Sequence, residues 1–480
     1  MPGRAGPRRH GLVPGGSCKT AAITNRFGEL VTDAAAETPI IKRRHVAAAV
    51  AGNALEFYDF TTYATFAAAI GHAFFPSGHG GLLDTEFGSL MLSLFTFGAG
   101  FLLRPIGGIV LGHYADRIGR RPAMLLSFTL MGLAILALAI IPSYSVIGIA
   151  APMLAILARL TQGFALGGEV GPTTAYLVES APANRRGLYA SWQSASQSIA
   201  SMVGGAVGVI LSTQLDPQTL DIYGWRVAFL LGALTLPFGI YIRRSLPETL
   251  HTPDHLPHQE HKSFIAGLAG HTRPVILALF IFMGGTVATY VLSYMTTFAR
   301  TTLHMGTTQS FSATLVNGFV GVIASLAGGL LSDVYGRRLM MVGSRGLFLV
   351  LAYPIFLLIV DQRSTTALLL GVATLSILLN VSSGAFYVAF IEVLPKRVRG
   401  GIFATVYATA IAVFGGTTQP LIAWLIHVTG NPMAPAWYLL LASLLSLVAM
   451  YLMVESAPVR LAPSDVAAET EPEPGLPPTA

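Results

Sequence analysis

Long apolar runs alternate with short polar stretches along most of this sequence. Twelve runs are each long enough to cross a bilayer as a helix, because about 20 apolar residues span the hydrocarbon. The ten-residue segments of alternating polarity that a transmembrane β-barrel needs are absent. The pattern therefore predicts an all-α polytopic membrane protein. The twelve runs lie near 46–74, 87–112, 122–142, 147–178, 187–213, 225–243, 274–299, 309–332, 339–360, 366–392, 401–427 and 435–454.

The loops between these runs alternate in charge. One set is rich in arginine and lysine, and the other set is neutral or acidic. Positive charge accumulates in cytoplasmic loops, so we expect the basic loops and both termini to be cytoplasmic, at the plasma membrane (the inner membrane in a bacterium). The basic loops are 42–45, 116–121, 184–186, 243–244, 336–338 and 396–399, and the others are 71–86, 142–145, 213–224, 361–363 and 427–435.

Composition supports a membrane protein. Hydrophobic residues make up 53% of the chain and charged residues 11%, against about 25% charged in soluble proteins. The formal charge of +6 is spread over the basic loops, so nucleic acid is not an expected partner. Cys18 is the only cysteine, which excludes an intrachain disulfide. Residues 1–43, without signal-peptide features, and 456–480 are predicted to be disordered cytoplasmic tails.

Two motifs recur about 215 residues apart, an interval of six predicted spans. GHYADRIGRR (112–121) returns as GLLSDVYGRR (329–338), and ESAPANRRG (179–187) returns as EVLPKRVRG (392–400). Parallel halves around a midplane cavity are typical of secondary transporters.

The repeat predicts six-helix bundles over 44–243 and 273–455, joined by a cytoplasmic loop at 244–272. Histidines in that loop could suggest a metal site, but a hydrated linker is the favoured interpretation, and we expect no metal or cofactor.

Four runs carry polar residues on one helical face. An ionisable group at the centre of a span costs roughly 2.5–3.5 kcal/mol even on the lenient scale, so these faces are expected to line a shared aqueous cavity. The residues concerned are Asn53, Glu56, Asp59 and Tyr63 in the first run, Arg159, Gln162 and Glu169 in the fourth, Gln193 and Gln197 in the fifth, and Thr289 and Tyr290 in the seventh.

The chemistry of these residues suits an anion. Arg104 and Arg159 offer planar, permanently charged donors for carboxylates, although Arg104 could instead lie near the inner surface or pair with a first-run acid, and Arg159 could instead hold Glu169 or Gln162. The other predicted substrate contacts are Asn53, Tyr63, Gln162, Gln193, Gln197, Thr289 and Tyr290.

Three acids are candidates for proton coupling: Glu56, Asp59 and Glu169. A carboxyl that alternates between apolar and arginine-bearing surroundings can load and release a proton. Glu56 could instead form a fixed salt bridge with Arg104.

The repeated loop motifs are predicted to hold the two halves together at the cytoplasmic face, because acids, arginines and helix ends recur there at equal spacing. The alternative is that these arginines only set topology. Trp225 and Arg226 are interpreted as an anchor at the outer interface. The predicted gate residues are Asp116, Arg117, Gly119, Arg120, Arg121, Glu179, Arg186, Asp333, Gly336, Arg337, Arg338, Glu392 and Arg399.

The paired motifs at 112–121 and 329–338, with RLTQGFALGGE (159–169), resemble signatures of the major facilitator superfamily. The fifth run (194–211) lacks the proline of the drug antiporters, which favours a symporter. GNALEFYDF (52–60) is similar to the metabolite–proton symporter family, and SWQSASQ (191–197) and AVFGGTTQP (412–420) look most like proton-coupled citrate and tricarballylate carriers.

This resemblance implies the major facilitator fold and import of citrate or a related tricarboxylate by proton symport with alternating access. It also implies a monomer in the bilayer. A dicarboxylate such as 2-oxoglutarate, a monocarboxylate or a zwitterionic osmolyte remains an alternative. A receptor or enzyme without transport is a remote one, because no nucleophile motif or nucleotide-binding loop is present.

Overall fold

The computed structural model describes residues 43–77, 85–118, 120–167, 181–234, 271–394 and 399–457, together with several isolated positions. Within these ranges every regular element is a helix. Residues from His45 onward belong to one compact unit. The predicted tail at 1–43 and the loop at 244–272 fall almost entirely outside the described residues.

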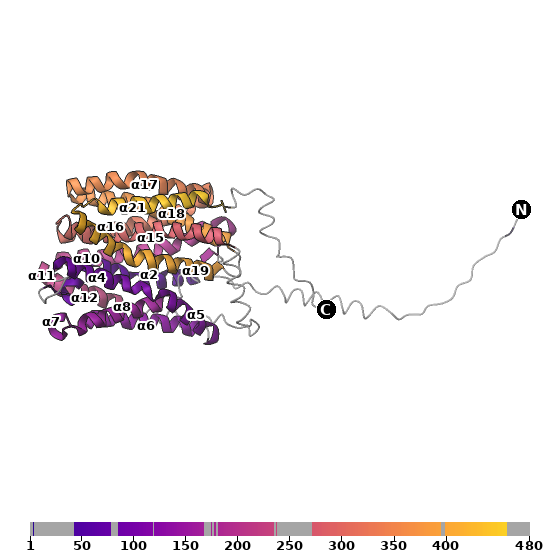
Figure 1. Cartoon of the computed structure of the whole chain (residues 1–480). Helices are drawn as coiled ribbons and strands as arrows, with labels where there is room; N and C mark the ends of the chain where they lie inside the picture. Colours follow the sequence, from indigo (N-terminus) through magenta and orange to yellow (C-terminus); the bar gives the residue numbers. More distant parts are fainter. Residues whose placement is uncertain are drawn as a thin grey trace. The chain divides into compact units, whose positions relative to one another are not determined.

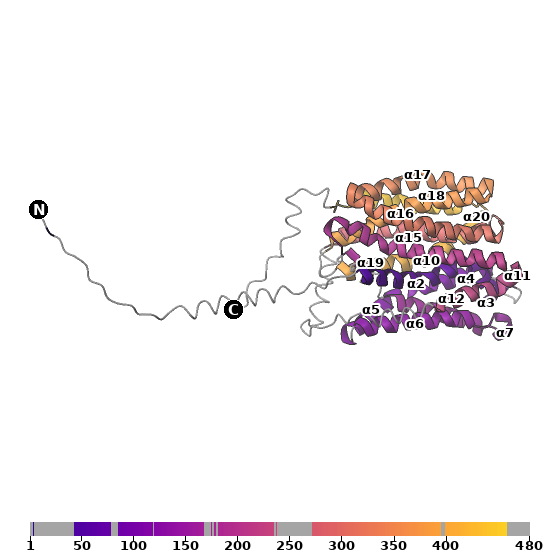
Figure 2. The ribbon, with the colours of Figure 1, turned by 180° about the vertical axis from the view of Figure 1, so that it is seen from behind.

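The helices lie side by side, as Figures 1 and 2 show from opposite sides. In the first part of the chain they are α2 (Arg43–Thr65), α3 (Ala67–Phe74), α4 (Glu86–Leu102), α5 (Arg104–Ile118), α6 (Arg120–Ile140), α7 (Tyr144–Ile147), α8 (Ala150–Leu166), η1 (Ala183–Arg185), α10 (Arg186–Gln214), α11 (Pro217–Thr219), η2 (Leu220–Gly224) and α12 (Trp225–Ala233). In the second part they are α15 (Thr272–Thr301), α16 (Thr307–Tyr335), α17 (Arg337–Gln362), α18 (Thr365–Val393), α19 (Arg399–Ala410), η3 (Ile411–Gly415), α20 (Gly416–Thr429) and α21 (Ala434–Leu452).

Each of the twelve predicted runs contains at least one of these helices. In the described part of the chain, eight helices are long and apolar enough to cross a membrane, and 125–140 and 150–166 are shorter apolar helices. The first run is divided at Phe66 into α2 and α3, and the eleventh contains the π-helical turn η3. The predicted all-α polytopic membrane fold is confirmed.

Helices α10 and α16 form the most extensive helix–helix contact of the described structure. Glycines permit it: a Cβ on Gly205 would overlap the backbone of Leu315, and a Cβ on Gly318 would overlap that of Met202. Small residues let helix backbones approach closely where no hydrophobic effect drives association. Because α10 comes from the first repeat and α16 from the second, this contact joins the two copies of the repeated sequence.

The burial of Trp225 contradicts the interpretation of this residue as an anchor at the outer interface. Its side chain is fully buried, and its ring meets Phe74 at 5.3 Å and Phe229 at 6.2 Å between centroids. Arg226 lies 4.2 Å from the Trp225 ring and donates hydrogen bonds to the carbonyl oxygens of Ala139 and Ile141. Trp225 therefore packs the start of α12 against α3, and Arg226 ties it to the end of α6.

Candidate functional site

A cavity lies among helices of both repeats. Its volume is about 90 Å³, enough for several water molecules, since one water needs roughly 10–15 Å³ of such space. Helices α2, α4 and α10 supply one side, and α15, α17, α18, α19, η3 and α21 supply the rest. Its polar lining consists of Thr61, Gln197, Ser201, Thr286, Thr289, Tyr290, Ser293, Arg345, Ser383, Tyr387 and Tyr407.

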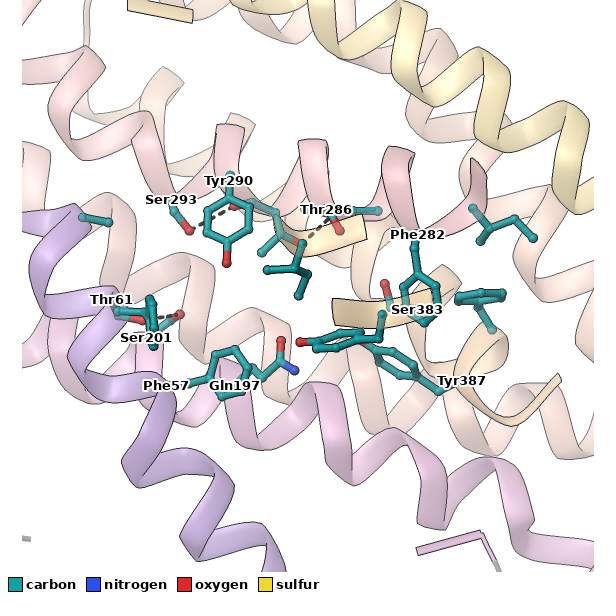
Figure 3. A pocket seen from close by; sticks show the side chains of 18 of the residues that line it. Phe57, Thr61, Gln197, Ser201, Phe282, Thr286, Tyr290, Ser293, Ser383 and Tyr387 are labelled. Carbon is teal, nitrogen blue, oxygen red and sulfur yellow. Dashed lines mark hydrogen bonds between the residues drawn. The ribbon is translucent and has the colours of Figure 1, made fainter. Parts of the chain in front are cut away.

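Hydrogen-bonding groups face this cavity from both sides. Figure 3 shows Thr61, Ser201 and Gln197 opposite the α15 side chains of Tyr290 and Ser293. The hydroxyls of Thr61 and Ser201 lie 3.4 Å apart, whereas Nε2 of Gln197 has no hydrogen-bond partner among the described residues. The Gln197 amide thus faces the cavity next to the hydroxyls of Tyr387 and Tyr407.

Three predicted substrate contacts line the cavity: Gln197, Thr289 and Tyr290. The other six are absent from the lining of this structure, and their role as substrate contacts stays a prediction. They are Asn53, Tyr63, Arg104, Arg159, Gln162 and Gln193.

Several of these six bind one another or their neighbours. Asn53 donates from Nδ2 to Oγ of Ser196 at 2.6 Å, and Gln193 donates from Nε2 to Oδ1 of Asn53 at 3.2 Å. The Tyr63 hydroxyl donates to the carbonyl oxygen of Ser93 at 3.2 Å. These contacts tie α2 to α10 and α4, so the shared polar faces are used partly for helix packing.

Asp59 and Arg159 form a fully buried ion pair. Nη1 of Arg159 lies 2.7 Å from Oδ2 of Asp59, and neither side chain is exposed. Gln162 donates to Oδ1 of Asp59 at 3.3 Å and accepts from Nη1 of Arg159. Two partners were predicted for Arg159: Gln162, which contacts it, and Glu169, which lies outside the described residues. The ion pair with Asp59 was not predicted. Glu56 is also buried.

Two aromatic rings that line the cavity, Phe60 and Phe97, also lie beside the predicted arginines. Phe60 lines the cavity, and its ring centroid lies 4.8 Å from the guanidinium carbon of Arg104 and 4.6 Å from that of Arg159. Phe101 and Tyr63 complete the aromatic surroundings, at 4.6 Å from Arg104 and Arg159 respectively. Cation–π attraction stabilises a guanidinium in such surroundings without neutralising it.

Arg345 lines the cavity and was missed by sequence reasoning. It is buried, and its Nε and Nη1 atoms have no hydrogen-bond partner in the described part of the chain. The signal was a single arginine inside the apolar run 339–360. Because Arg345 lies only a few residues after the loop arginines Arg337 and Arg338, it was not considered separately as a residue within the membrane.

At the inner end, meaning the end with the basic loops, Asp333 of α16 caps the start of α10. Its carboxylate accepts from the amides of Gly187 at 2.8 Å and Leu188 at 3.0 Å. Arg337 lies 2.6 Å from Asp333 and 3.3 Å from Glu392. The second copy of the repeated loop therefore contacts the first half of the chain.

Other predicted gate residues lie around this contact. Arg186 approaches Glu392 at 3.9 Å, and Arg338 donates to the Tyr451 carbonyl at 2.6 Å. Gly336 ends α16 with a φ of 99°, and Arg117 is exposed. The remaining positions, or their side chains, lie outside the described structure: Asp116, Gly119, Arg120, Arg121, Glu179 and Arg399.

At the opposite, outer end, Asp221 of η2 contacts Arg300 of α15. Nη2 of Arg300 lies 2.6 Å from Oδ1 of Asp221, and Nδ1 of His72 lies 3.8 Å from Oδ2. Burial raises the pKa of Asp221, but the side chains of His72 and Arg300 more than offset this and hold it below its usual value. The two repeats are thus joined by polar contacts at both ends of the helices.

Relatives of this chain include proton symporters. The citrate-proton symporter of Klebsiella pneumoniae is 36% identical over 408 residues, covering 85% of this chain and 90% of the relative. The citrate-proton symporter of Salmonella typhi is 35% identical over 421 residues, covering 88% and 95%. The proline/betaine transporter of Escherichia coli K12 is 29% identical over 436 residues, covering 86% and 84%.

A solved structure and a family model agree on the fold. The crystal structure of a D-xylose-proton symporter superposes with a TM-score of 0.70 at 18% identity, covering 87% of this chain and 99% of that one. The model of the Major Facilitator Superfamily matches residues 50–417. With that match and the 35–36% identity to full-length relatives, the chain belongs to the major facilitator superfamily.

Proposed function

We propose that this protein imports a carboxylate metabolite by proton symport, with citrate as the leading candidate. The observation that carries the proposal is the buried Asp59–Arg159 pair, which lies behind the cavity-lining rings of Phe60 and Phe97. Similarity to two citrate-proton symporters over most of the chain supports the choice of acid.

The pair offers a way to couple a proton to an anion. While Asp59 is ionised, its charge neutralises Arg159 at 2.7 Å. A proton on Asp59 removes that neutralisation and leaves a buried cation, which is unfavourable in a low-dielectric interior. An incoming carboxylate then restores charge balance, so a protonated carrier binds the anion better than a deprotonated one.

Alternating access would use the polar contacts at the two ends. The Asp333 contact with the start of α10 would close the inner side, and the Asp221–Arg300 contact would close the outer side. Each would open while the other stays closed. Both contacts are present in this structure, as expected for an occluded arrangement.

The membrane potential sets the number of protons. Moving one elementary charge across 100 mV is worth about 2.3 kcal/mol. An acid with several negative charges is therefore repelled by an inside-negative potential. Inward transport is electrically favourable only if more protons than substrate charges move together.

The remaining features follow from the same proposal. Both termini would be cytoplasmic in the plasma membrane, and the six-helix halves would comprise 44–243 and 273–455. The chain would act as a monomer that transports its substrate unchanged, without enzymatic chemistry.

Uptake of labelled citrate into proteoliposomes containing the purified protein tests the function. We expect accumulation with an inward proton gradient and none after an uncoupler collapses it. Unlabelled tricarballylate, 2-oxoglutarate, acetate, proline and betaine serve as competitors. Absence of citrate uptake, or uptake that ignores the gradient, contradicts the proposal, and stronger competition by another solute replaces citrate with that solute.

A further inference from the structure

Arg345 is the sole charged side chain among the described residues that line the cavity. No aspartate or glutamate accompanies it there. It lies on α17, eight residues after Arg337, or about 12 Å along the helix at 1.5 Å per residue. Its side chain is 1% exposed, so the guanidinium does not reach bulk water at the inner end.

The guanidinium extends toward the middle of α15. A Cβ built on Gly285 would lie 3.8 Å from Nη2 of Arg345, and Gly285 and Thr286 stand near the midpoint of that helix. The ring of Phe348 lies 5.5 Å from the guanidinium carbon and provides only a weak electrostatic partner. Because Nε and Nη1 lack hydrogen-bond partners among the described residues, several donors remain available.

An unpaired arginine inside a membrane protein is unfavourable and usually marks a substrate path. Arg159 has Asp59 as its counter-charge, whereas the lining around Arg345 holds neutral hydroxyls, amides and aromatic rings. A ligand can supply the missing negative charge. A carboxylate matches the fork of guanidinium donors and can accept two parallel hydrogen bonds.

We infer that Arg345 binds one carboxylate of the substrate from the second half of the chain and makes the carrier selective for acids with at least two carboxylates. The inference rests on the proposed function for the identity of the substrate. Arg159, once Asp59 is protonated, offers a binding group in the first half. An acid that engages both arginines connects the halves, and an acid with one carboxylate satisfies only one of them.

The test compares Arg345→Lys, Arg345→Gln and Arg345→Met with the parent protein. KM and Vmax for citrate uptake and the melting temperature without ligand are measured for each. We expect Gln and Met to raise KM about ten- to hundredfold, because charge-assisted hydrogen bonds are lost, and Lys to raise it less. The ligand-free Gln and Met variants should melt at or above the parent temperature, because an uncompensated buried charge is removed.

Arg363→Gln is the matched control. Arg363 is the residue directly after α17. It is exposed and lies at the opposite end of this helix from Arg337. The substitution should leave KM unchanged. A purely structural role for Arg345 would instead lower the melting temperature and Vmax while KM stays within about twofold of the parent, and that result would overturn the inference.

Citrate uptake by the parent protein distinguishes failure of the proposed function from failure of the role inferred for Arg345. If the parent takes up citrate and the Gln variant has the parent KM, the inference fails and the proposed function stands. If the parent does not take up citrate, the proposed function fails. Arg345 is then tested by the stabilisation that tricarballylate, succinate and acetate give to the melting of parent and Gln variant, and equal stabilisation of both proteins by every acid overturns the inference.

Discussion

The Arg159 guanidinium and the Asp59 carboxylate lie 2.7 Å apart with neither side chain exposed. The Asp59 carboxylate is the counter-charge of Arg159, and Gln162 hydrogen-bonds to both side chains. Such a pair resists separation by solvent, but a single proton on the acid abolishes it. This makes the pair a switch between a neutral and a cationic interior.

Asp59→Asn should abolish proton-driven accumulation of citrate, because the variant cannot take up or release the coupling proton. Citrate exchange between the two sides should survive, since exchange needs no net proton movement. The protein should also lose stability, because breaking a buried pair by removing one partner costs about 3–5 kcal/mol. Uptake with and without a gradient, counterflow exchange and the melting temperature check these outcomes.

The double variant Asp59→Asn/Arg159→Gln is the control for that loss of stability. It leaves no uncompensated charge, so it should melt at a higher temperature than Asp59→Asn alone. Full gradient-driven accumulation by Asp59→Asn would exclude Asp59 as the essential proton site.

Asp221→Asn should weaken closure of the outer end. A reporter cysteine at Ser293, in a Cys18→Ser background, faces the cavity and can be labelled by an impermeant thiol reagent. Labelling from the outer side should accelerate up to about fivefold, because a partly exposed ion pair contributes up to about 1 kcal/mol. Asp216→Asn is the matched control: Asp216 caps α11 in the same loop by accepting from the Thr219 amide, and its loss should leave labelling unchanged.

The same reporter checks the pH dependence. The pKa of Asp221 is held below its usual value, so its ionised form stabilises the outer contact above about pH 3.9, and this stabilisation is lost only as pH falls through the lower native pKa. With His72 in place, the labelling rate normalised to a free thiol should not rise as pH falls from 8 to 5, because Asp221 stays ionised over that range. A rise within that range would show that Asp221 does not hold the contact as described.

Arg337→Gln should destabilise the protein far more than Arg338→Gln, although the two residues are adjacent. Arg337 is fully buried and bridges Asp333 and Glu392, whereas Arg338 donates to the Tyr451 carbonyl in an exposed contact. Removing Arg337 leaves Asp333 without its ion-pair partner and Glu392 with only the more distant Arg186, at a cost of about 3–5 kcal/mol. Equal melting temperatures for the two variants would contradict this assignment.

Gly318→Ala should separate α10 from α16, because the added methyl group would overlap the Met202 backbone. Overpacking of this kind costs about 1–3 kcal/mol, and a backbone neighbour cannot move aside as a flexible side chain can. Gly343→Ala on α17 is the control, since nothing lies within 4 Å of its added methyl group. Melting temperature and citrate uptake should fall for the first variant and stay near the parent values for the second.

The hydrophobic pattern was sufficient to predict the helices, because crossing a bilayer demands long apolar segments whatever surrounds them. The repeated motifs also identified Asp333, Arg337 and Glu392 as a group, and these residues lie in contact. Spacing alone could not reveal that Asp333 binds the start of α10, since this contact depends on how the two repeats are placed.

The site was less predictable. A helical face shows which residues point the same way, but not whether a cavity or another helix lies opposite. Asn53 and Gln193 face each other and form a hydrogen bond, while Gln197, one turn further along α10, reaches the cavity. Arg345 was missed for a related reason. It is close in sequence to the loop residues Arg337 and Arg338, and sequence distance does not show how far inside the helix bundle a side chain lies.

Phe60 contacts two buried cations at once. Both Arg104 and Arg159 rest on this one ring, 4.8 and 4.6 Å from its centroid. A single rotation of the Phe60 side chain would change the surroundings of two cations in the same event. Arg159 also lies 5.4 Å from the ring of Phe97, which lines the cavity as well. Movement of Phe60 would therefore alter the electrostatics of both arginines together, whereas movement of Phe97 would act on Arg159.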